Sequence, residues 1–191
     1  SERISQRAEQ LFYRLSKLYM RDGHAYFLYD EALNPVIPWA DGVKSQTTAL
    51  SLFTYSDAFV AKGLVAAACR FDRQNITLFL DYLHKVIAAI EDERFQMEEK
   101  HALSMENAKS EPDDFGPRMI LLGAAGLLHR CNYSDEAGFA DRFIDDVLAR
   151  YYDTVSGLLL NVPKQDSCNL GHGIEFCGFA FEHLARRPDD S

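Results

Sequence analysis

The chain has 191 residues, of which 47% are hydrophobic and 12% aromatic. This is enough apolar material for a substantial core, which excludes a disordered chain. Twenty Lys and Arg stand against 29 Asp and Glu, so the net charge is -9, and the basic residues form no cluster that would follow a phosphate backbone. We therefore expect no nucleic-acid partner.

Hydropathy and cysteine spacing indicate where the protein is located and whether it binds a metal. No apolar run reaches the roughly 18 to 20 residues that a bilayer-spanning helix needs, and the start, Ser1-Glu2-Arg3, lacks the pattern of a signal peptide. We therefore expect a cytoplasmic protein with no membrane partner. The cysteines show no C-x-x-C metal pattern and are predicted to be reduced core thiols, with no metal and no cofactor. They are Cys69, Cys131, Cys168 and Cys177.

The first predicted element is an amphipathic helix over residues 3–20, in which apolar side chains recur at helical spacing. Asp22-Gly23 ends this helix. Residues 25–31 are predicted to form a short strand, and a loop follows it. Trp39, the only tryptophan, lies on that loop.

Two types of helix then alternate along the chain. Residues 48–71 and 115–130 are dense in small and apolar side chains, which predicts buried helices. Residues 75–91 and 134–152 have apolar side chains on one side only, which predicts helices with a solvated face. Ser134 is the expected N-cap of the last of these helices.

A polar stretch, residues 92–114, separates the two halves of this pattern. Connections longer than about 15 residues are usually functional or mobile. An acidic run near its start is predicted to be a solvated helix end. The run comprises Glu91, Asp92, Glu93, Glu98 and Glu99.

Residues 169–184 predict a last helix, with apolar or small side chains at most positions, as is typical of a helix buried nearly all round. His172 and Glu175 are three residues apart, so their side chains share one face of this helix. A carboxylate next to an imidazole fixes its tautomer and raises its basicity, which prepares it for proton transfer near neutral pH. Alternatively, His172 only caps backbone groups or fills core space.

The buried helices recur with a period. Asp57, Arg118 and Glu175 occupy comparable places in three of them, 61 and then 57 residues apart. The repeating unit is therefore a helix pair of about 60 residues, and such pairs stack into a solenoid or close into a toroid. Residues 176–181 are too apolar for a terminal cap, so we expect a portion of a larger protein or contact with a second copy.

Three motifs resemble the N-acylglucosamine 2-epimerase superfamily, which includes cellobiose 2-epimerases and bacterial aldose-ketose isomerases. Residues 55–59 are similar to its tyrosine-serine-acid-x-phenylalanine helix, residues 116–122 to its proline-x-methionine helix, and residues 171–176 to its glycine-histidine-x-x-glutamate helix. The resemblance covers nearly the whole chain. It implies an all-α fold of (α/α)6-barrel type, with about three helical hairpins, half a barrel, in a single domain over residues 1–191.

The resemblance also implies a sugar epimerase or isomerase whose small-molecule substrate is an open-chain sugar. His172 would be one of two catalytic histidines that move a proton next to the carbonyl, and Glu175 would support it or hold the substrate. The family's second histidine lies on a later inner helix, which this chain does not reach. We therefore expect the rest of the barrel, or a homodimer, to complete the site.

Four residues are candidates for binding the sugar, and each has an alternative. Asp57 lines the pocket or bonds structurally to a loop backbone, and Tyr55 meets the sugar or is a core tyrosine. Arg118 stands where many relatives carry a histidine; it indicates an acidic sugar, or it is an ion-paired arginine. Trp39 stacks on the sugar ring or packs in the ordinary way.

Two other functions stay open. A glycoside hydrolase of the unsaturated glucuronyl hydrolase type, on the same toroid, would use Asp57 or Glu175 with water, and Arg118 would hold a uronate. A protein that binds sugar without turnover is the third possibility. Released monosaccharide separates hydrolysis from epimerisation, because an epimerase yields isomers of equal mass.

Overall fold

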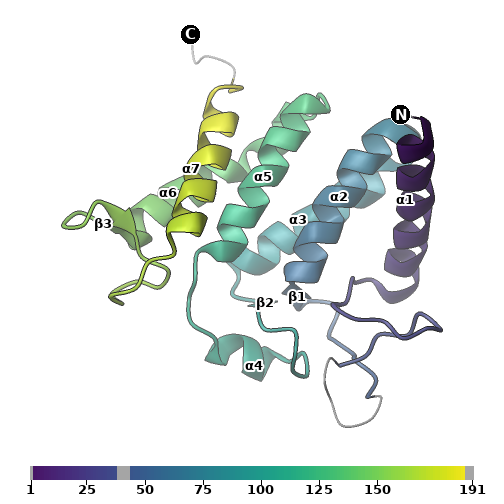
Figure 1. Cartoon of the computed structure of the whole chain (residues 1–191), viewed down its shortest axis with the longest axis horizontal. Helices are drawn as coiled ribbons and strands as arrows, with labels where there is room; N and C mark the ends of the chain where they lie inside the picture. Colours follow the sequence, from purple (N-terminus) through teal and green to yellow (C-terminus); the bar gives the residue numbers. More distant parts are fainter. Residues whose placement is uncertain (1, 38–43, 188–191) are drawn as a thin grey trace. The chain divides into compact units, whose positions relative to one another are not determined.

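The computed structural model describes residues 2–37 and 44–187 (Figure 1). The chain divides into two compact units, unit 1 (Ser1–Glu111) and unit 2 (Pro112–Ser191). Regular structure in both is mostly helical, which confirms the all-α class. The single domain expected over residues 1–191 stays a prediction.

Unit 1 is organised around α2 (Tyr55–Phe71), against which α1 (Glu2–Asp22) and α3 (Ile76–Glu91) pack. Figure 1 shows α1 and α3 running antiparallel to α2. The 3-10 turn η1 (Arg73–Asn75) joins α2 to α3, and such short connections bring consecutive helices side by side. The helices predicted over residues 3–20, 48–71 and 75–91 are confirmed, although α2 begins later than expected.

The core of unit 1 follows from the side chains of α2 and α3. The small side chains of Ala58, Ala61 and Ala68 are fully buried and allow close approach of the neighbouring helices. From α3, Leu83 and Val86 are equally buried on the predicted apolar side. Burial of this apolar side, rather than helix propensity alone, holds a helix of this length in place.

The polar connection after α3 is more ordered than predicted. It contains β2 (Phe95–Gln96), which pairs in parallel with β1 (Phe53–Thr54), and α4 (Met105–Ser110). Ser104 caps α4, since its side chain accepts a hydrogen bond from the backbone N–H of Asn107 at 3.1 Å. The strand predicted over residues 25–31 is wrong, because that segment forms a loop with only an isolated bridge from Tyr29 to Pro35.

Unit 2 contains α5 (Gly116–Arg130), α6 (Phe139–Tyr151) and α7 (Leu170–Leu184). A 3-10 turn, η2 (Ser134–Ala137), precedes α6, and a small antiparallel ladder of β3 (Tyr152–Asp153) and β4 (Leu158–Leu159) follows it. Both α6 and α7 pack against α5, and Figure 1 shows α7 running parallel to α5. Close approach of α7 requires small residues on α5: a Cβ at Gly123 would lie 3.2 Å from the ring of Phe179.

The prediction that α7 is buried nearly all round is wrong for the described part of the chain. Only Phe176, Ala180 and His183 are buried, because α5, α6 and β4 contact one side of the helix. Ile174 and Phe181 are 74% and 70% exposed on the other side. This side of α7 is therefore an exposed apolar stripe, which continues through Leu170 and Leu184.

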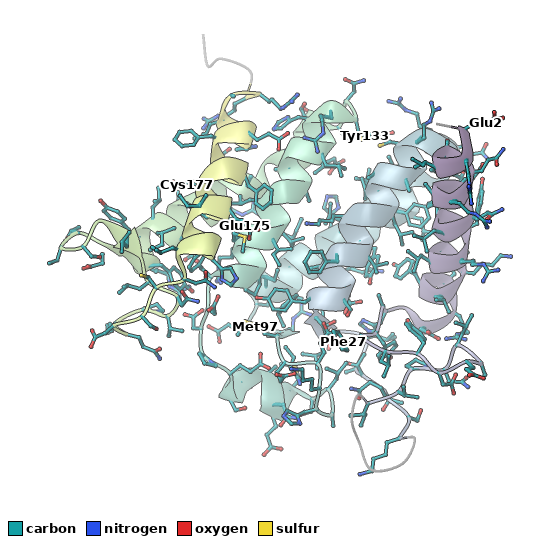
Figure 2. All side chains as sticks on the ribbon, in the orientation of Figure 1. Glu2, Phe27, Met97, Tyr133, Glu175 and Cys177 are labelled. Carbon is teal, nitrogen blue, oxygen red and sulfur yellow. The ribbon has the colours of Figure 1, made fainter. Side chains whose placement is uncertain are left out.

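The structure bears on the predictions about the cysteines and about membrane-spanning segments. All four cysteines are free, but Cys168 and Cys177 are exposed and the other two are half-buried, so the prediction of core thiols is wrong. Figure 2 shows Cys177 on α7. Among the described helices, none combines the length and apolar character that crossing a membrane requires.

Candidate functional site

Unit 1 contains a pocket of about 480 Å³ beside the first turn of α2. The loop after α1 and the segment after β2 supply its other walls, and Figure 2 labels one residue of each, Phe27 and Met97. Aromatic walls with a few polar groups are typical of small-molecule sites. The lining residues are Tyr26, Phe27, Tyr55, Ser56, Phe59, Val60, Met97, Glu98, Glu99 and Lys100.

Of the predicted sugar-binding residues that the structure describes, only Tyr55 lines this pocket. It is the first residue of α2, and its ring meets that of Phe95 edge-on, with centroids 5.4 Å apart and planes at 84°. This contact holds the tyrosine ring at the pocket wall. A hydrogen bond from Tyr55 to a substrate stays a prediction.

Glu99 is the most unusual group in the pocket wall, because its side chain is buried. Its Oε1 accepts a hydrogen bond from the backbone N–H of Ser56 at 2.8 Å, whereas Oε2 is buried and has no hydrogen-bond partner in the described structure. Burial raises the pKa of the Glu99 carboxyl, hydrogen bonding by Ser56 lowers it, and the charge of Asp57 raises it. A carboxyl group with a raised pKa in a pocket is a candidate functional group.

The prediction that Glu99 belongs to a solvated helix end is wrong. Residues 97–100 lie against the start of α2, and the hydrogen bond to Ser56 holds Glu99 there. No sequence signal separates Glu99 from its exposed neighbour Glu98, because both stand in the same acidic run. Ser56 and Phe59 also line the pocket, and the motif over residues 55–59 would have indicated them.

Asp57 has the structural role that was the alternative to pocket lining. Its side chain is fully buried, and Oδ1 accepts hydrogen bonds from the backbone N–H of Ala25 at 2.8 Å and the hydroxyl of Tyr82 at 2.5 Å. Oδ2 accepts from the N–H of Thr54 at 3.0 Å, and the Thr54 side chain accepts from the N–H of Asp57, which completes a capping box. Both oxygens are engaged, so the prediction that Asp57 lines the pocket is wrong.

In unit 2, His172 lies in the first turn of α7. Its backbone N–H donates to the side chain of the N-cap residue Asn169 at 3.2 Å, and its half-buried ring stands at 88° to the ring of Phe115, with centroids 6.3 Å apart. Its Nδ1 is buried without a hydrogen-bond partner in the described structure.

A series of hydrogen bonds fixes the start of α7 relative to the start of α5. Asp114 accepts from the N–H of Gly116 at 2.6 Å and from the side chain of Asn161 at 3.2 Å. Asn161 in turn accepts from the N–H of Asn169 at 2.5 Å. The cap of α7, and with it His172, is therefore positioned by polar groups around the first turn of α5.

Glu175 does not bond to His172 as predicted. Glu175 is exposed (Figure 2), and no hydrogen bond joins the two side chains in the part of the chain that the structure describes. The ring of His172 turns instead toward Phe115. The comparable places in the repeat also differ from the prediction: Asp57, Arg118 and His172 are each the third residue of their helix, 61 and then 54 residues apart.

Arg118 is ion-paired, which was the alternative to substrate binding. Its Nε lies 2.7 Å from Oδ2 of Asp146 on α6, and its Nη1 lies 4.0 Å from Asp113. Arg150 pairs with the same two carboxylates, and the hydroxyl of Tyr151 donates to Asp113 at 2.8 Å. This network holds α5 to α6, so a uronate would have to displace Asp146 to reach Arg118.

The two remaining expectations concern Trp39 and metals. Trp39 lies outside the described residues, so its role stays a prediction. Within residues 2–37 and 44–187, no group of three His, Cys, Asp or Glu side chains is arranged to hold a metal ion.

Replacing Asp57 with Asn should destabilise unit 1 by about 2 to 4 kcal/mol, because the new amide group would face donors that now point at a carboxylate oxygen. Urea unfolding followed by circular dichroism measures this change. Asp81→Asn, at an exposed position on α3, is the matched control and should change stability by less than about 0.5 kcal/mol. Equal stability of the two variants would contradict the structural role of Asp57.

Glu99 should make stability depend on pH with a definite sign. Its pKa in the folded state is raised above the ordinary 4.5, so the folded state holds a proton that the unfolded chain releases. The contribution of Glu99 to the free energy of unfolding is therefore fully present below pH 4.5, and it is lost as the pH rises through the pKa of Glu99 in the folded state. Glu99→Gln removes this titration, so urea unfolding should show the variant gaining stability relative to the parent as pH rises. A stability difference between variant and parent that does not change with pH would contradict this prediction.

Comparisons with models of protein families, with curated proteins and with solved structures give no match. The family resemblance therefore depends on the three motifs at residues 55–59, 116–122 and 171–176.

Proposed function

We propose that this protein is a sugar epimerase or isomerase of the N-acylglucosamine 2-epimerase type, in which His172 transfers a proton next to the carbonyl of an open-chain sugar. The observation that carries the proposal is the buried Nδ1 of His172 without a hydrogen-bond partner. Buried polar atoms are nearly always paired, and an exception at an ordered position calls for a functional reason. The cap at Asn169 and the contact with Phe115 hold the ring in one place, as proton transfer requires.

The chemistry needs one group that takes and returns a proton. The neutral imidazole of His172 removes the C2 hydrogen of the aldehyde form, which is acidic because the resulting charge is delocalised onto the carbonyl oxygen. A proton returned to the opposite face of C2 gives the 2-epimer, and a proton delivered to C1 gives the ketose. In this proposal Glu175, which is exposed one turn further along α7, contacts a sugar hydroxyl rather than orienting His172.

The fold supports the same proposal. In each unit a helix rich in small residues, α2 or α5, packs against an amphipathic partner, α3 or α6, as the hairpins of an (α/α)6 toroid do. Asp57, Arg118 and His172 occupy the third position of α2, α5 and α7, which supports a common repeat. The exposed apolar stripe of α7 supports the further proposal that the rest of a barrel, or a second copy, covers it.

The test is exchange of the C2 hydrogen in deuterated water, followed by NMR with glucose, mannose, N-acetylmannosamine and cellobiose as substrates. His172→Asn should lower the exchange rate by about 10² to 10⁴, the usual contribution of a general base. His101→Asn, at an exposed position in unit 1, is the control and should leave the rate unchanged. Exchange that persists in His172→Asn, or that is absent from the parent with all four sugars, would contradict the proposal.

Glycoside hydrolysis is the second candidate, because Glu99 favours it. Glycosidases use a carboxyl group with a raised pKa as their general acid; Glu99 is such a group in an aromatic pocket, and Glu98 supplies a second carboxyl group in the same wall. Incubation with disaccharides should then release monosaccharides, and Glu99→Gln should slow their release by at least about 10²-fold. Products of unchanged mass would contradict hydrolysis and favour the epimerase proposal.

A further inference from the structure

Four side chains of unit 2 form a continuous hydrogen-bonded series that does not include His172. Ser134 Oγ lies 3.0 Å from Nδ1 of His129, and Nε2 of His129 lies 3.0 Å from Nδ1 of His183. Nε2 of His183 lies 3.3 Å from Oδ1 of Asp141, which also accepts from Arg187 at 3.1 Å. A hydroxyl, two imidazoles and a carboxylate are thus connected in series.

The packing of unit 2 brings these groups together. His129 and His183 stand in the last turns of α5 and α7, and their rings are nearly parallel, with centroids 5.2 Å apart and planes at 30°. Ser134 begins η2, which packs against α5, and Asp141 lies in the first turn of α6. Figure 2 labels Tyr133, the residue directly before Ser134. Four different elements therefore converge on the two rings.

The hydrogen bonds have one consistent direction when both imidazoles are neutral. The carboxylate of Asp141 can only accept, so His183 must carry its proton on Nε2 and present Nδ1 as an acceptor. His129 must then carry its proton on Nε2, which leaves its Nδ1 as an acceptor for the hydroxyl of Ser134. The Ser134 hydroxyl is therefore the donor that ends the series, and it points at a basic nitrogen.

The environment of His129 favours the neutral form of its ring. Burial lowers the pKa of His129, and the neighbouring His183 and Arg186 lower it further, while Glu182 and Asp141 raise it. Because His183 is only 2% exposed, its ring is fixed between His129 and Asp141. The base is thus held in one tautomer by a second ring and a carboxylate.

Ser134 does not have the structural role predicted for it. The residue at the N-cap of η2 is Tyr133, no side chain caps that turn, and α6 begins only at Phe139. Ser134 is exposed, and its hydroxyl bonds to His129. An exposed hydroxyl bonded to an imidazole, which a third group orients, is the arrangement that activates nucleophilic serines.

We propose that Ser134 is a nucleophile that accepts acyl groups from activated esters, with His129 as its general base and with His183 and Asp141 as positioning residues. This site is independent of His172 and of the pocket in unit 1. The Oγ of Ser134 bonds to the ester carbonyl carbon while its proton passes to Nδ1 of His129. The tetrahedral adduct breaks its bond to the leaving oxygen, and the proton of His129 goes to the leaving phenol or alcohol. Water then attacks the acyl-serine, His129 takes one water proton and returns it to Oγ, and a carboxylic acid leaves.

The test uses 4-nitrophenyl acetate and a fluorophosphonate probe on the whole chain, with mass spectrometry of peptides to locate the modified residue. Ser134 should be modified and Ser134→Ala should lose the modification. Ser110 is the internal control, because it is exposed and donates only to a backbone carbonyl. Its modification should be at least about tenfold slower than that of Ser134.

The pH dependence of the modification rate distinguishes a Ser134 that His129 activates from a Ser134 that is only exposed. The rate at Ser134 should rise as His129 loses its proton, with a midpoint below the ordinary imidazole value of 6.5. His129→Gln should remove this step, and Asp141→Asn, which removes a charge that raises the pKa of His129, should move the midpoint lower. Asp135→Asn, an exposed neighbour outside the series, should leave the midpoint unchanged. Equal rates at Ser134 and Ser110, an unchanged profile in His129→Gln, or modification of His129 itself would overturn the proposal.

Discussion

The buried carboxylate of Asp57 is the constraint on which unit 1 depends. It accepts hydrogen bonds from the loop after α1, from the cap of α2 and from Tyr82 on α3, so three segments are held at one point. Such a charge is costly to bury and is stable only when its oxygens are fully hydrogen-bonded. The start of α2 is therefore fixed, and the N–H of Ser56 that holds Glu99 and the ring of Tyr55 are fixed with it. Asp57 thus fixes the helix start that carries two lining residues of the pocket without lining the pocket itself.

Unit 2 fixes the starts of its helices with one carboxylate and two amide side chains. The first turns of α5 and α7 are joined through Asp114, Asn161 and Asn169, and the last of these caps the turn that carries His172. In unit 1 the side chain of Thr54 accepts a hydrogen bond from the backbone N–H of Asp57, the third residue of α2. In unit 2 the side chain of Asn169 accepts one from the backbone N–H of His172, the third residue of α7. The residue at the third position is then free to differ in chemistry: a structural carboxylate in α2 and a half-buried imidazole in α7.

Hydrophobic periodicity predicted the helices, because burial on one side of a helix leaves a regular pattern in the sequence. It did not predict which of the apolar helices is covered by other elements on every side. α7 has an exposed apolar stripe, although burial nearly all round was expected. The polar groups were harder still. Glu98 and Glu99 are adjacent acids in one polar segment, and only the hydrogen bond to Ser56 makes the second a buried group. His129 and His183 are 54 residues apart in the sequence, and helix packing alone brings Nε2 of the first to 3.0 Å from Nδ1 of the second. Local patterns carry no information on such pairs.

α7 carries two histidines with opposite environments, and the helix itself separates them. His172 stands in its first turn and His183 in its last, so the helical rise places them about 16 Å apart along the axis. Nδ1 of His172 has no hydrogen-bond partner in the described structure, whereas both nitrogens of His183 are engaged. Hydrogen bonds at both ring nitrogens fix the tautomer and the orientation of His183, whereas the hydrogen bonds of His172 do not fix its tautomer. The two histidines of one helix therefore differ in their hydrogen bonding because they contact different elements of unit 2.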